Sequence, residues 1–101
     1  MQYLKVDWRH DHPDEPISLY SECDDAGWEK RKVEVFRDGR FGCAGIDGDA
    51  AGSRLGTEPL PDLNAIAQDP AFRPVRITQA EFERAWAAAQ TEPARRTNAA
   101  L

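Results

Sequence analysis

Two histidines and a group of carboxylates near the N-terminus are the densest set of potential metal ligands in the sequence. His10 and His12 are one residue apart, and the carboxylates Asp11, Asp14 and Glu15 stand around them. If the first strand extends to residue 12, both imidazoles point to the same side, and Asp14 could supply a third ligand for zinc or a related ion. The same residues are typical of a solvated turn, in which Asp side chains accept hydrogen bonds from nearby backbone N–H groups. We expect the turn, with no metal or other cofactor bound, and His10, His12 and Asp14 are the alternative metal ligands.

The sequence has two cysteines, Cys23 and Cys43. We expect a third strand between the two that carry them, which separates the cysteines by two strand spacings of about 4.8 Å, beyond the roughly 7 Å reach of a disulfide. A catalytic thiol would need a base and an electropositive setting. We therefore expect both cysteines to be free and to serve as small apolar strand residues.

Glu34 is the carboxylate best suited to acid–base chemistry, because we expect it on a hairpin beside aromatic residues, and such chemistry needs pocketed groups with shifted pKa values. Its ordinary role would be that of a solvated partner for Lys32 or for an arginine. The sequence contains no Gly-x-Ser-x-Gly elbow, no Walker loop and no Gly-x-Gly-x-x-Gly fingerprint. These absences favour a protein that is not an enzyme. The alternative is a small-ligand or metal-binding protein, or a minor enzyme, with a site near His10, His12 and Glu34.

Charge is unevenly distributed along the chain. The 101 residues have a formal net charge of −5, but residues 1–29 hold eight acids and two bases, a sum of −6, and residues 30–40 hold five bases and two acids, a sum of +3. Acidic proteins bind DNA, RNA and anionic lipid poorly. Lys30, Lys32 and Arg40 lie near aromatic residues that could stack on bases, but strand alternation divides these cations between two faces. We expect neither nucleic-acid nor membrane binding.

The elements that carry these residues are strands first and helices afterwards. Apolar and polar residues alternate in four segments, which predict strands over residues 2–8, 17–23, 28–37 and 40–44. A fifth, short strand could lie around residues 53–55. Apolar residues at helical spacing predict one helix from Pro61 or Asp62 to Ala67. A second helix begins at the N-cap Thr78, with Glu81 completing a capping box, and ends at residues 91–93.

The connection between the third and fourth strands is Asp38-Gly39, which favours a two-residue type I′ turn. That turn places Phe36 opposite Phe41 on one, partly open face of the sheet. Val33 points to the other face, which we expect to meet the core. The predicted core consists of Leu4, Val6, Val33 and Val35 under helices that bear Ile66, Phe82 and Trp86.

This order of elements predicts a single α+β domain over residues 1–90. Its sheet is an antiparallel meander of about four strands, with the short fifth one as an addition, and two C-terminal helices cover one face of that sheet. Residues 91–101 are predicted to be a loose tail. No apolar run approaches the about 20 residues that a membrane span needs, and the N-terminus lacks the pattern of a signal peptide, so we expect a cytoplasmic protein.

Four segments together resemble a known group of proteins. They read YLKVDW, DEPISLYSE, RKVEVFRDGRFG and FRPVRITQAEFERAW. The chain resembles, over about residues 3–88, a family of small actinobacterial proteins of unknown function that open with a YLKVxW-like strand and carry a KVEVFRDGR-like hairpin. The resemblance implies a bacterial protein of that family and implies no activity or catalytic residue. Small proteins of this kind are often similar to members of toxin and immunity gene neighbourhoods.

We therefore expect a protein that acts by binding a basic protein partner through an acidic surface, as an inhibitor or immunity protein would. The same acids could simply keep the protein soluble. An exposed pair of phenylalanines or an uncovered edge strand could also form a homodimer in place of a monomer. The predicted contact residues are Asp11, Asp14, Glu15, Asp24, Asp25, Phe36 and Phe41.

Overall fold

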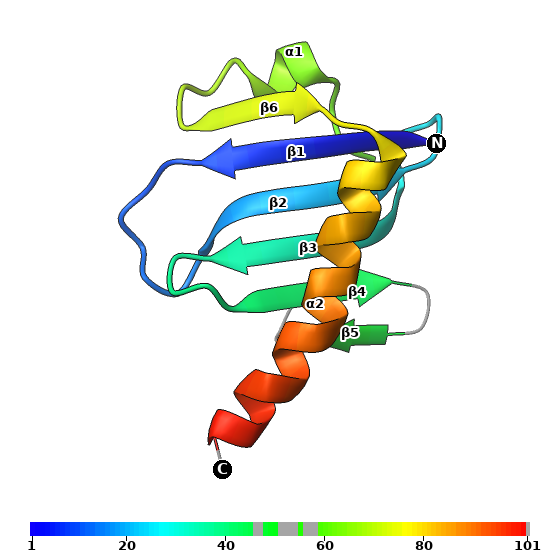
Figure 1. Cartoon of the computed structure of the whole chain (residues 1–101). Coiled ribbons are helices and arrows are strands. Elements are labelled where there is room, and N and C mark those ends of the chain that lie inside the picture. The colour runs from blue at the N-terminus through cyan, green and yellow to red at the C-terminus, as the bar shows by residue number, and fades with distance from the viewer. Residues whose placement is uncertain (46–47, 51–54, 56–58, 101) are drawn as a thin grey trace.

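Six strands form one antiparallel sheet in the computed structural model, which describes residues 1–45, 48–50, 55 and 59–100. The strands are β1 (Gln2–Trp8), β2 (Pro16–Cys23), β3 (Glu29–Phe36), β4 (Phe41–Gly45), β5 (Gly48–Ala50) and β6 (Phe72–Arg76). Their order across the sheet is β5-β4-β3-β2-β1-β6, and two helices, α1 (Leu63–Ile66) and α2 (Gln79–Ala100), complete the fold (Figure 1). The predicted α+β class and the meander of the first four strands are confirmed.

Helix α2 packs across one face of the sheet, which we name the α2 face (Figure 1). At its N-terminus the Oγ1 of Thr78 accepts a hydrogen bond from the Glu81 backbone N–H at 3.1 Å, and the Glu81 carboxylate accepts one from the Thr78 N–H at 3.1 Å. The predicted capping box is therefore confirmed. The buried cluster between the helix and the sheet consists of Phe82 and Ala89 of α2 and of Val33 and Cys43 of the sheet, with Tyr3, Tyr20, Val35, Phe41, Ile77, Ala85 and Trp86 packed around them. Burial of one large apolar side chain contributes about 1.5 to 3 kcal/mol, so this cluster holds α2 to the sheet.

Helix α2 is longer than predicted. It continues through Pro93 to Ala100, where the sequence led us to expect a loose tail from residue 91. Proline removes one backbone hydrogen bond inside a helix, but alanine has the highest helix propensity and is frequent on both sides of this position. The helix therefore extends across a residue that ordinarily ends one.

The loop between β3 and β4 has three residues, which corrects the predicted two-residue turn. The carbonyl oxygen of Phe36 accepts a hydrogen bond from the Gly39 N–H at 3.0 Å, and the Phe36 N–H donates to the carbonyl oxygen of Arg40 at 2.9 Å. Gly39 has φ +90°, a conformation that glycine adopts without strain. A type I turn followed by a left-handed residue is the ordinary three-residue hairpin loop. The added residue places Val35, and not Phe36, opposite Phe41.

This one-residue shift moves the two phenylalanines to opposite faces of the sheet, because strand side chains alternate. Phe41 packs against the cluster under α2, together with Val33 as predicted. Phe36 points to the other face and is 9% exposed. The predicted open patch formed by both phenylalanines is therefore wrong.

The face of the sheet opposite α2, which we name the α1 face, is partly covered by α1 and the residues around it. Val6 and Leu19 of the sheet line a common pocket with Ile66 of α1. Leu4, two residues from Val6 on the same strand, is 5% exposed. The prediction that both helices cover one face, and that Leu4 and Val6 share a core with Val33, is wrong. Strand β1 has apolar side chains on both faces, so alternation alone did not identify the face that meets α2.

Strand β6 was not predicted. It pairs with β1, with Pro74 opposite Val6. The Arg9 N–H donates to Ala71 and the Ile77 N–H donates to Tyr3, so the odd-numbered residues of this segment turn their backbone groups toward β1. Pro74, which has no N–H, therefore faces outward, as proline does on an edge strand.

The fifth strand also differs from the prediction. Strand β5 covers Gly48–Ala50, whereas the predicted strand was placed around residues 53–55. Residues 53 and 54 lie outside the described part of the chain, and Leu55 does not belong to a strand.

Candidate functional site

The predicted acidic surface is divided between two ends of the sheet. Residues 9–15 connect β1 to β2, and residues 24–28 connect β2 to β3. Because the three strands are antiparallel, these connections lie at opposite ends of β2, an eight-residue strand about 26 Å long at 3.3 Å per residue (Figure 1). Asp11 and Asp25 therefore do not belong to one continuous surface, which corrects that expectation.

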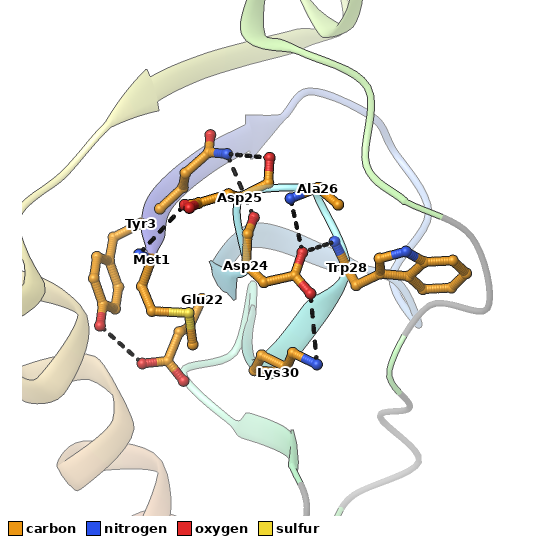
Figure 2. Close-up of polar contacts among 9 residues, drawn as sticks. Met1, Tyr3, Glu22, Asp24, Asp25, Ala26, Trp28 and Lys30 are labelled. Atoms are coloured by element: carbon orange, nitrogen blue, oxygen red, sulfur yellow. Dashed lines mark hydrogen bonds and ion pairs between the residues drawn. The ribbon is translucent and has the colours of Figure 1, made fainter.

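Asp24 shapes the turn between β2 and β3. Its Oδ1 accepts hydrogen bonds from the backbone N–H groups of Ala26 and Trp28, both at 3.0 Å, and its Oδ2 lies 3.6 Å from the Nζ of Lys30 (Figure 2). These contacts, led by the Trp28 N–H, lower the pKa of Asp24 from its ordinary value. The carboxylate is thus committed to holding the turn.

Four further acids within residues 1–29 also have a cationic partner. The pairs are Asp25 with the N-terminal amine of Met1 at 3.6 Å, Asp7 with Lys5 at 3.8 Å, Glu22 with Arg31 at 2.7 Å and Glu29 with Lys32 at 3.9 Å. Together with Asp24, five of the eight acids of residues 1–29 therefore lie within ion-pair distance of a cation.

The remaining three acids, Asp11, Asp14 and Glu15, all lie in the β1–β2 loop and are exposed. Within the described residues, no ion pair joins any of them to a basic side chain. The acidic excess that the sequence spreads over 29 residues is therefore concentrated, in the folded chain, in one loop.

Hydrogen bonds of His10 fix the backbone of this loop. The Nε2 of His10 donates to the carbonyl oxygen of Pro16 at 2.7 Å, and its Nδ1 accepts from the backbone N–H of His12 at 3.0 Å. Its ring packs against Trp8 with 4.2 Å between centroids and 49° between the ring planes, and its carbonyl oxygen accepts a hydrogen bond from Arg37 at 2.6 Å. The loop therefore presents its carboxylates from a defined conformation.

The same bonds bear on the alternative metal site. Both ring nitrogens of His10 are engaged by the backbone, so neither is available to a metal ion without a change in the loop. No three ligand residues of the described part of the chain are grouped as a metal site would require. The structure thus does not bring His10, His12 and Asp14 together as a ligand set.

Glu34 lies apart from these histidines. It stands on β3 opposite Leu19 and Gly42, with its side chain on the α1 face. The hollow of about 610 Å³ beside His10 is lined by residues of β1, of the β1–β2 loop, of β2 and by Arg37, without Glu34. A joint site of His10, His12 and Glu34 therefore receives no support from this geometry.

Sequence reasoning missed the role of Arg31, which ties α2 to the sheet. Its guanidinium donates to Glu22 twice at 2.7 Å and to Glu83 of α2 at 3.0 and 2.7 Å. It also lies 4.9 Å from the ring centroid of Phe82 and 5.1 Å from that of Trp86. Hydrogen bonds from Arg31 lower the pKa values of both Glu22 and Glu83. Such a network is a structural contact, because each charge in it already has its partner.

The two cysteines are free, as predicted. Cys23 is 1% exposed, and burial raises the pKa of its thiol to about 11, which leaves it protonated and unreactive. Cys43 faces α2, where its Sγ accepts a hydrogen bond from Gln90 at 3.5 Å. Neither thiol has the setting of a nucleophile.

Within the described residues, none of the helices has the length and apolar character needed to cross a membrane.

Comparisons with known proteins identify the family of this chain. Neither the curated proteins nor the solved structures contain a match to this chain. One family model matches residues 2–91, which include the six described strands and residues 79–91 of α2. The chain therefore belongs to the family described as "Domain of unknown function (DUF6881)".

Proposed function

We propose that this protein is a non-enzymatic interaction module that binds a basic surface of another protein through its β1–β2 loop, as an inhibitor or immunity protein does. The observation that carries the proposal is that Asp11, Asp14 and Glu15 are exposed and lack an ion pair with any described residue, whereas the other acids of residues 1–29 are paired. Unpaired carboxylates on a protein surface attract a basic partner and raise the rate of its association. We also propose that the protein is bacterial and that it acts in the cytoplasm.

The fixed conformation of the loop supports this role. Binding is weakened when flexible groups must be ordered in the complex. The hydrogen bonds of His10 to Pro16 and His12 order this loop before any partner arrives. A partner therefore meets carboxylates that are already positioned.

The hollow beside the loop does not add to this surface. It has a volume of about 610 Å³, and two acids, Asp7 and Asp11, line it together with two arginines, Arg9 and Arg37. These opposite charges balance, so the hollow does not favour a basic side chain. We therefore assign the contact with the partner to the exposed carboxylates of the loop.

Four of the contact residues predicted from the sequence are left out of the proposed surface. Asp24 holds the turn at the other end of the sheet through Trp28, and Asp25 lies at that same end, 3.6 Å from the N-terminal amine. Phe36 is buried on the α1 face, and Phe41 packs under α2. The contacts of these four residues within the chain account for their positions, so we do not assign them to the surface that binds a partner protein.

The proposal is tested by capture from an extract of the native host with two variants of equal net charge. The loop variant is Asp11→Asn/Asp14→Asn/Glu15→Gln. The control variant is Asp25→Asn/Asp38→Asn/Asp62→Asn, which removes three exposed acids from other parts of the surface. A basic protein retained by the wild type and by the control variant, but lost from the loop variant, supports the proposal. Equal retention of that protein by all three baits contradicts it.

A further inference from the structure

The α1 face of the sheet contains a pocket that belongs to neither the acidic loop nor the α2 core. It has a volume of about 420 Å³ and lies between the sheet and the chain around α1. Val6, Leu19 and Phe72 form its wall on the sheet, and Leu60 and Ile66 form the wall opposite them. This volume is within the range of pockets that bind small molecules.

Three polar residues of the sheet interrupt this apolar lining. They are Ser21, Glu29 and Lys32, and Ser21 stands opposite Lys32 in the pairing of β2 with β3. The Oγ of Ser21 donates a hydrogen bond to Glu29 at 3.1 Å. The side chains of Glu29 and Lys32 are only 5% and 14% exposed. A few convergent polar groups in an apolar pocket are the usual composition of a small-molecule site.

The ammonium group of Lys32 has N–H donors that no described residue accepts. Its Nζ lies 3.9 Å from the Oε1 of Glu29, which is an ion-pair distance and longer than a hydrogen bond. It donates no hydrogen bond to the residues that the structure describes, although an ammonium group carries three N–H donors. A nearly buried donor of this kind favours a ligand that brings an oxygen acceptor.

The charges of the pocket identify the class of that ligand. Glu29 and Lys32 are opposite charges within ion-pair distance, so a charged head group would gain one attraction and meet one repulsion. Asp69, which also lines the pocket, adds a second carboxylate that disfavours an anion. A cationic ammonium head group would bring no acceptor for the N–H groups of Lys32. We propose that this pocket binds an uncharged small molecule with an apolar body and one oxygen acceptor, a hydroxyl or a carbonyl, that accepts a hydrogen bond from Lys32. This site is independent of the function proposed for the β1–β2 loop.

The test compares three probes with the same six-carbon chain, namely 1-hexanol, hexanoate and hexylammonium, titrated into the ¹⁵N-labelled full chain and followed by amide chemical shifts. We expect saturable shifts centred on Leu19, Ser21 and Ala65 with 1-hexanol, and binding about five-fold weaker or more for both charged probes. Shifts centred elsewhere, or equal affinity for the three probes, would overturn the proposal.

One pair of variants and one single substitution distinguish binding in the pocket from effects on general stability. Ala65→Phe fills the pocket from an exposed position of α1, and Ala87→Phe is its control on the exposed surface of α2. We expect the first to abolish binding of 1-hexanol and the second to leave it unchanged. Lys32→Met should weaken that binding about five-fold because the donor is removed. Unchanged binding in Ala65→Phe would overturn the proposal even where Lys32→Met does not fold.

Discussion

The Nε2 of His10 lies 2.7 Å from the carbonyl oxygen of Pro16 and donates a hydrogen bond to it, which joins the start of the β1–β2 loop to the first residue of β2. A loop of exposed polar residues would otherwise be free to sample many conformations. The bond closes the loop around Asp11, Asp14 and Glu15.

Replacing His10 tests this closure. In His10→Ala we expect the free energy of unfolding to fall by about 1 to 2 kcal/mol, because the side chain makes two hydrogen bonds and each usually contributes about 1 kcal/mol. Amide hydrogen exchange of residues 11–15 should become faster, while exchange in β3 and β4 stays unchanged. His12→Ala is the comparison: it removes the ring that stacks on His10 at 5.4 Å between centroids and keeps the backbone N–H that donates to His10, so it separates ring stacking from the hydrogen bonds. Unchanged exchange in the His10 variant would show that the loop is ordered by other contacts.

The contact of Arg31 with Glu22 and Glu83 predicts a large loss of stability when the arginine is removed. Arg31→Met should lower the free energy of unfolding by about 2 kcal/mol, between the values for exposed and buried ion pairs. The loss arises because the Glu22 carboxylate, whose side chain is 9% exposed, would keep its charge without its partner. Urea denaturation measures the effect. The double variant Arg31→Met/Glu22→Gln should recover part of it, and no recovery would contradict a role for the unpaired charge.

The same contact predicts a dependence of stability on pH. Hydrogen bonds from Arg31 hold the pKa values of Glu22 and Glu83 below their ordinary value of 4.5. A carboxyl group with a lowered pKa in the folded state contributes stability that is complete above its unfolded pKa and is lost as the pH falls through the folded pKa. We therefore expect the free energy of unfolding to decrease below about pH 4.5, and to decrease less steeply in Arg31→Met. Equal slopes in both proteins would contradict this assignment.

Two glycines with positive φ offer a comparison between backbone strain alone and strain with a steric clash. Gly39 has φ +90° and open space around it, whereas a Cβ on Gly27, at φ +92°, would lie 2.9 Å from the carbonyl oxygen of Leu60. Gly39→Ala should reduce the free energy of unfolding by about 1 kcal/mol. Gly27→Ala should reduce it further, because the chain at Leu60 must also move. Equal losses in the two variants would mean that Leu60 does not pack against this turn.

Local patterns in the sequence predicted those features of the fold that depend on neighbouring residues. The capping box of Thr78 and Glu81 is one example, and the alternation that places Val33 under α2 is another. Features that depend on distant contacts were missed. Strand β6 contains Pro74 and forms only because β1 offers an edge on which the missing N–H faces outward. The length of the loop at Gly39 differed by one residue, and that difference reversed the face of Phe41.

From the sequence, the candidate site could be predicted only as an excess of acidic residues near the N-terminus. The sequence shows eight acids within residues 1–29, and it does not show which of them the fold provides with a partner. Lys30 reaches Asp24 across a turn, and Arg31 stands directly opposite Glu22 on the neighbouring strand. These pairings depend on register, so the identification of Asp11, Asp14 and Glu15 as the unpaired acids required the folded chain.

The association rate constant of the partner, once captured and purified, tests the central claim most directly. Biolayer interferometry at low ionic strength compares the wild type with the loop variant Asp11→Asn/Asp14→Asn/Glu15→Gln and with the control variant Asp25→Asn/Asp38→Asn/Asp62→Asn. We expect association to be about ten-fold slower for the loop variant and nearly unchanged for the control, with the difference reduced at high salt. Equal slowing in both variants would show that net charge alone matters, and it would contradict a binding surface in the β1–β2 loop.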